Sequence, residues 1–191
     1  MKTLSLSFIP LILLLCGSAP DTNLVTLKNK KAAIDQYEYN HRKEMTVFIK
    51  LEGKKKLIRA KNENWPDYTE YIYNVLKDES GKIILTEQIP YSQSGDWYVE
   101  WKHYFDANGN IFAFSKRETV FDNGVKGGVA VEESLKYYDS NFKVVGQTSR
   151  LTDKDEKTLN RNKNEFNFRD DKFNIYRNVN DCLKGYHIED N

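Results

Sequence analysis

The sequence predicts an all-β domain, an antiparallel meander of hairpins that forms a curved sheet or an open barrel. Between residues 45 and 151, β-prone segments with alternating apolar positions follow one another, separated by short turns of Asp, Asn, Ser and Gly. No long helical period interrupts them. Hydrophobic residues make up 39% of the chain and aromatic residues 13%, enough for a buried core. We therefore expect a single β-rich domain over residues 33–191.

The predicted strands form four pairs, each joined by a short turn. Alternation places successive side chains on opposite faces of a sheet, so each strand presents one set of residues to each side. The pairs are 45–51 with 56–60, 69–77 with 82–89, 97–105 with 110–121, and 129–138 with 142–151.

Aspartate begins three of these turns, at Asp78, Asp106 and Asp139. An aspartate in this position can accept a hydrogen bond from the backbone N–H two residues further on. The turn after Asp106 ends in Gly109, where we expect a positive φ because glycine adopts it without steric cost. The turn after Asp139 lacks glycine, and there we expect Asn141 to be left-handed.

The segment 97–105 carries aromatic side chains on both faces. Trp97 and Trp101 share one face, and Tyr98 and Tyr104 share the other. Such a strand is either covered on both sides or uses one face to bind a ligand, since flat exposed rings stack on sugars and anchor protein partners. These four residues are therefore the candidate ligand-binding residues.

A three-residue turn with a bulge at Gly109 would fix the register of this hairpin. Small residues would then lie opposite large rings and let the faces interdigitate. The expected pairs are Phe105 with Ile111, His103 with Ala113, and Trp101 with Ser115.

The pattern changes after residue 151. Thr152 is a candidate cap for a short helix whose first turn holds Asp153 and Asp155. Alternating apolar residues between 166 and 175 predict one more hairpin. We expect the chain to close with a short helical or irregular segment.

The first fifteen residues have the features of an export signal. Lys2 gives a positive start, and residues 4–15 are almost wholly apolar. This run is shorter than the roughly 20 residues that a membrane-spanning helix needs. Cleavage before Cys16 or after Ala19 would remove it, and retention as an anchor is a further alternative.

The segment Leu13-Leu14-Leu15-Cys16-Gly17 resembles the lipobox of bacterial lipoproteins. The resemblance covers about the first 17 residues, and Leu15 departs from the Gly, Ala or Ser usual at its position. It implies diacylglycerol on the Cys16 thiol and a fatty acid such as palmitate on the new amine, which anchors the chain firmly. Residues 16–32 would then be a lipidated tether to the cell envelope, on the periplasmic or surface face of the outer membrane.

The charge balance excludes one class of partner. Lys and Arg number 29 against 28 Asp and Glu, and loss of Lys2 with the signal would leave the chain formally neutral. A nucleic-acid binder normally shows a basic footprint, so we expect no nucleic-acid partner. The Lys54-Lys55-Lys56 turn is expected to be a solvated loop, with contact to anionic headgroups as its alternative.

No motif for catalysis, a metal or a cofactor is present. Cys182 and His187 alone do not complete a zinc site, and the turn after Asp106 has Arg117 where a calcium loop closes with Glu. We expect His103 to be a packed strand residue and Cys182 a buried thiol.

The function expected from the sequence is that of a non-catalytic envelope lipoprotein with a binding or structural role. The alternatives are a surface glycan-binding lipoprotein that uses exposed Trp and Tyr side chains, and an envelope hydrolase. The membrane, through Cys16, is the expected partner, together with a protein or a glycan.

Overall fold

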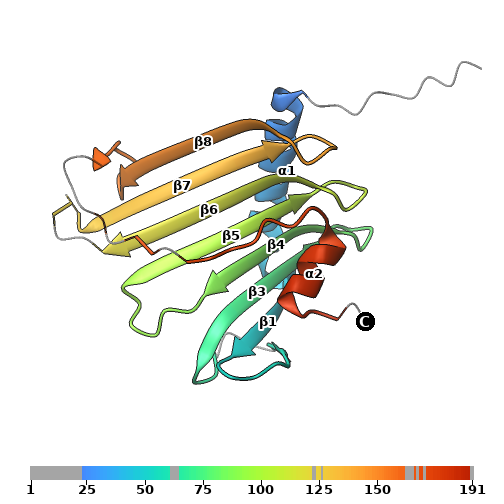
Figure 1. Cartoon of the computed structure of the whole chain (residues 1–191), viewed down its shortest axis with the longest axis horizontal. Coiled ribbons are helices and arrows are strands. Elements are labelled where there is room, and N and C mark those ends of the chain that lie inside the picture. The colour runs from blue at the N-terminus through green and yellow to red at the C-terminus, as the bar shows by residue number, and fades with distance from the viewer. Residues whose placement is uncertain are drawn as a thin grey trace, which may run out of the picture.

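The eight predicted strands lie side by side in one antiparallel sheet (Figure 1). The computed structural model describes residues 23–60, 65–121, 124–125, 127–161, 166, 168–169 and 171–189. Within these residues the strand order is β2-β1-β3-β4-β5-β6-β7-β8, so the sheet is open, with β2 and β8 at its edges. The predicted all-β antiparallel fold is confirmed in its open form; the strands follow chain order from β3 to β8, while β1 lies between β2 and β3.

The strands lie within two residues of the predicted bounds. Two helices and a 3-10 turn complete the described structure. The elements are α1 (Leu24–His41), η1 (Arg42–Glu44), β1 (Thr46–Leu51), β2 (Ile58–Arg59), β3 (Thr69–Lys77), β4 (Ile83–Pro90), β5 (Trp97–Phe105), β6 (Ile111–Phe121), β7 (Val129–Tyr138), β8 (Val144–Asp153) and α2 (Val179–Tyr186).

Three hairpin turns share one hydrogen-bond pattern. In each, the aspartate Oδ1 accepts from the backbone N–H groups two and four residues on, as Asp106 does from Asn108 and Asn110 at 2.9 Å. Gly109 has the predicted positive φ, 76°. The prediction for Asn141 is wrong, because Phe142 occupies the position equivalent to Gly109 and takes the left-handed conformation, with φ 65°.

Each of these turns is followed by a β-bulge. The bulge between β5 and β6 makes their register differ from the predicted one. Phe105 does pair with Ile111, but Tyr104 then pairs with Ala113 and leaves Phe112 as the extra residue. All pairs beyond are therefore shifted by one residue. The observed partners are His103 with Phe114 and Trp101 with Lys116.

Both faces of the sheet are covered, which explains the aromatic residues on both sides of β5. In Figure 1, α1 crosses behind the sheet, while the C-terminal segment and α2 cross in front. The α1 face buries the smaller cluster: Leu27, Met45, Leu76, Leu85, Tyr104, Phe112, Ala113 and Tyr137. The α2 face buries the larger: Tyr73, Val75, Val99, Trp101, Phe105, Ile111, Phe114, Tyr138, Cys182, Leu183, Tyr186 and Ile188.

Helix α1 includes half of the segment predicted as a tether. Residues 24–32 are helical, with Asn23 as the N-cap, and Leu27 is buried against the sheet. Leu24 lies so close to Gly146 of β8 that a Cβ there would meet its side chain at 2.6 Å. The boundary drawn at residue 33 therefore falls inside an element of the fold, while Cys16 and the signal lie outside the described residues.

Two predictions for the C-terminal part are also wrong. No helix begins at Thr152, because β8 continues to Asp153, whose carboxylate closes a turn through the N–H groups of Asp155 and Lys157. No hairpin forms among the described residues between 166 and 175. There, Phe166 and Phe168 pack against Val120, Val125 and Ala130, Phe173 stacks on Trp101, and α2 follows.

Candidate functional site

The four aromatic candidate residues do not form a common surface. Trp101 is fully buried and stacks on Phe173, with ring centroids 5.6 Å apart. Tyr104 is buried on the opposite face, where its hydroxyl donates to Asp35 of α1 at 2.9 Å. Trp97 is half-buried beneath the Arg169 guanidinium, 4.0 Å from its ring centroid.

Tyr98 is the exposed member of the set, with 37% of its surface accessible. Its hydroxyl donates to Glu100 at 2.8 Å, on the α1 face. Exposed, coplanar Trp97 and Trp101 would have favoured a glycan platform. Because Trp101 is buried, it cannot form an exposed platform for a glycan together with Trp97.

His103 is a packed, hydrogen-bonded core residue, as its sequence context suggests. Its Nε2 lies 3.1 Å from the Asn174 carbonyl, and its Nδ1 lies 3.3 Å from the Tyr186 hydroxyl. Because a carbonyl only accepts, Nε2 carries the proton, and Nδ1 accepts from Tyr186. Burial lowers the pKa of His103 to about 4.

This histidine makes the fold sensitive to acid. In the unfolded chain its pKa returns to about 6.5, so between these values the unfolded state binds the proton more readily. We expect stability to fall as pH drops from about 6.5 to 4, by up to roughly 1.4 kcal/mol per pH unit from this group. Urea unfolding at pH 7 and pH 5 measures it. His103→Gln should lose this part of the slope, and an unchanged slope would contradict the assignment.

Cys182 is buried, as expected, and its thiol lies 3.2 Å from the Thr86 hydroxyl. Burial raises the pKa of this thiol to about 11, which keeps it protonated and unreactive. Among the described residues, no group of three or more His, Cys, Asp and Glu side chains is arranged to hold a metal ion.

A buried charge cluster joins α1 to the sheet. The Lys102 ammonium lies 2.7 Å from Glu38 of α1, 2.8 Å from Glu87 of β4 and 3.6 Å from Glu100. Asn74 donates to the other oxygen of Glu87 at 2.7 Å. Neither of the two pockets described below includes any of these side chains, so we assign the cluster a structural role.

The pKa values of the three carboxyl groups in this cluster shift in different directions. Burial raises the pKa of Glu38 and of Glu100, and the nearby carboxylate of Glu87 raises both further. Burial also acts against ionisation of Glu87, but Lys102 and the hydrogen bond from Asn74 hold its pKa below the usual range. Glu87 is therefore the carboxylate of the cluster whose ionised form is favoured.

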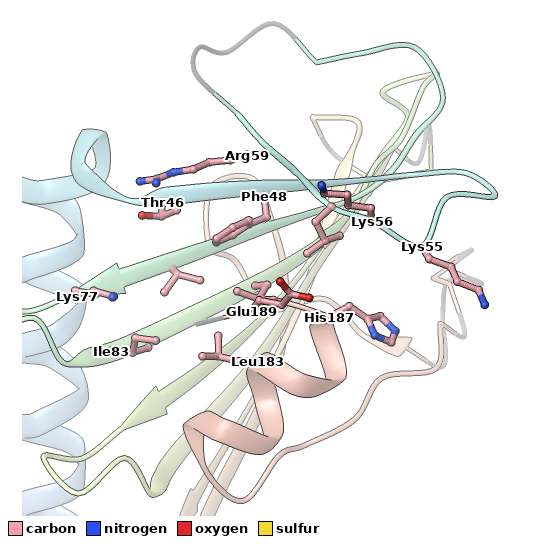
Figure 2. Close-up of a pocket in the computed structure, with 13 residues that line it drawn as sticks. Thr46, Phe48, Lys55, Lys56, Arg59, Lys77, Ile83, Leu183, His187 and Glu189 are labelled. Atoms are coloured by element: carbon pink, nitrogen blue, oxygen red, sulfur yellow. The ribbon is translucent and has the colours of Figure 1, made fainter. Parts of the chain in front are cut away.

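The site best formed for a ligand is a pocket of about 740 Å³ between α2 and the edge of the sheet at β1–β3 (Figure 2). This volume is within the range of small-molecule sites. Its apolar floor belongs to the main core and comes from Phe48, Leu57, Val75, Ile83, Leu183 and Ile188. We call this site the α2 pocket.

The end of α2 shapes one wall of the pocket. His187 takes a left-handed conformation, with φ 59°, and the Ile188 N–H returns to the Leu183 carbonyl at 2.9 Å. This helix ending turns the chain back toward the sheet and places Ile188 on the pocket floor. His187 and Glu189 remain exposed at the rim.

The rim is predominantly basic. Lys55 and Lys56 come from the loop before β2, Arg59 from β2 and Lys77 from the end of β3. None of these four side chains has an ion-pair partner among the residues that the structure describes, and Glu189 is the one acidic residue in the pocket lining. The pocket therefore combines an apolar floor with an excess of positive charge.

A second hollow, of about 320 Å³, adjoins the α2 pocket and shares Thr46, Val75 and Lys77 with it. Its other lining residues include three acids, Glu44, Asp78 and Glu79, so its charge is opposite in sign. Negative charge there would oppose an anionic ligand extending beyond Lys77.

The basic turn of Lys54, Lys55 and Lys56 is evident in the sequence, but the pocket that Lys55 and Lys56 line is not. The pocket lining spans residues 46–189 and depends on where α2 packs. No local pattern reveals such a site.

No family model, curated protein or solved structure matches this chain. The described helices include none that is long and apolar enough to cross a membrane.

Proposed function

We propose that this chain is a non-catalytic, lipid-anchored protein of the cell envelope that binds an amphipathic ligand in the α2 pocket. The observation that carries the proposal is the pairing of an apolar floor with four unpaired cations at its rim. An apolar concavity with a few polar groups is the usual form of a ligand site. The proposed anchor rests on the sequence around Cys16.

A dye with both properties tests the pocket. Anilinonaphthalene sulfonate, an aromatic anion whose fluorescence rises in apolar surroundings, should bind with one site per chain. Ile83→Glu places a negative charge on the floor and should weaken binding at least tenfold, about 1.4 kcal/mol. Ile58→Glu makes the same exchange at an exposed residue outside the pocket lining and should leave affinity unchanged. No binding, or equal loss in both variants, would contradict the proposal.

The anchor has its own test. Cys16→Ser should abolish labelling by a fatty-acid analogue and release the protein from the membrane fraction, because the modified thiol and its acyl chains would be absent. Fractionation and labelling in an expressing bacterial cell measure both. Unchanged labelling of the Cys16→Ser chain would contradict lipidation at this residue.

A further inference from the structure

The α2 pocket has the features of a site for one acyl chain. We propose that its ligand is a single-chain anionic amphiphile, such as a free fatty acid, with the chain on the apolar floor and the anionic head beside Arg59 and Lys77. This inference rests on the proposed function and adds the chemical class of the ligand.

The composition of the floor favours an aliphatic chain. Leu57, Val75, Ile83, Leu183 and Ile188 are aliphatic, and Phe48 is the single aromatic residue of the floor. Sugars and nucleobases are usually held by stacking on aromatic faces, which this floor offers at one position. Aliphatic side chains instead gain from burying methylene groups, at about 0.8 kcal/mol for each.

The positive charge divides between the two ends of the pocket. In Figure 2, Arg59, Lys77 and the Thr46 hydroxyl lie toward one end, and Lys55, Lys56 and His187 toward the other. Glu189 lies nearer His187 and offsets charge at that end.

Glu189 does not offset the charge at the Arg59–Lys77 end, so this end suits the anionic head. There, Arg59 offers paired donors in a plane, Lys77 a point charge and Thr46 a hydroxyl. The acids of the adjoining hollow, Glu44, Asp78 and Glu79, limit how far the head extends beyond Lys77. A carboxylate and a phosphate monoester would both be recognised by this set, so the head is defined by its negative charge.

Competition against the bound dye tests the ligand class, using monomeric dodecanoate, dodecyl phosphate, dodecanol and butanoate. We expect both long anions to displace the dye with at least tenfold higher affinity than dodecanol, which lacks the charge, or butanoate, which lacks the long chain. Equal affinity for dodecanol, or displacement by butanoate or inorganic phosphate alone, would overturn the proposal. Binding of the protein to anionic vesicles that is not reduced by dodecanoate would also overturn it.

Two matched variants test the placement of the head. Arg59→Met with Lys77→Met should weaken dodecanoate at least tenfold and leave dodecanol unchanged. Lys55→Met with Lys56→Met also removes two rim cations and should change dodecanoate affinity less than threefold. The reverse ranking would overturn the placement. If the dye binds and no long anion displaces it, the ligand class fails and the pocket stands; if the dye does not bind, the proposed function fails as well.

Discussion

Replacing Trp101 with alanine is expected to lower the free energy of unfolding by about 3–5 kcal/mol, as large-to-small changes at buried aromatic sites do. Trp101 is fully buried, and Phe173 covers it from the C-terminal segment. Its indole nitrogen has no hydrogen-bond partner among the described residues, so the substitution removes no hydrogen bond to them. Urea unfolding measures it.

An exposed aromatic residue on the same sheet provides the control. Phe121 is 65% accessible, and Phe121→Ala should change stability by less than about 1 kcal/mol. A Trp101→Ala midpoint close to that of the unmodified protein would contradict the two-sided core. It would also restore the interpretation of Trp101 as part of an exposed binding platform.

Lys102→Met should lower the free energy of unfolding by a similar amount, about 3–5 kcal/mol, because it leaves buried carboxylates without their cation. Glu87 is fully buried, and Glu38 and Lys102 connect α1 to the sheet. The methionine keeps much of the volume of lysine, so packing changes little. Unfolding at pH 7 measures the loss.

Lys136→Met is the matched control, since Lys136 is a half-buried strand lysine without an ion pair among the described residues. It should change stability by less than about 1 kcal/mol. Adding Glu87→Gln to Lys102→Met should recover part of the loss, because it removes the carboxylate left unpaired. Equal effects of Lys102→Met and Lys136→Met would contradict the structural role of the cluster.

The strands were predictable because their signals are local. Alternation set their bounds, and the turn aspartates and Gly109 marked where hairpins reverse. The bulge after each turn was not predictable in detail, since Phe112 is extra only in relation to its partner strand. One such residue shifts the register of every later pair.

Helix α1 was missed because charged residues interrupt its buried stripe. Leu24, Leu27 and Ile34 follow a helical spacing, but Lys31 and Glu38 fall on the same side. Those two residues are accommodated by ion pairs, which only the folded structure reveals. A search for apolar periodicity alone therefore predicts a tether here.

The candidate site was largely beyond prediction. The aromatic residues of β5 are conspicuous in the sequence, yet Trp101 and Tyr104 fill the core. The pocket depends on α2 meeting the far edge of the sheet, a contact between distant parts of the chain. Of its features, only the cluster of lysines around Lys55 is visible in the sequence.

Methyl-resolved NMR of the protein with dodecanoate tests the central claim most directly. We expect nuclear Overhauser effects between the acyl methylenes and the methyl groups of Ile83, Leu183 and Ile188, which belong to the pocket floor. Saturating dodecanoate that gives contacts only to methyl groups elsewhere, or none at all, would contradict binding in the α2 pocket.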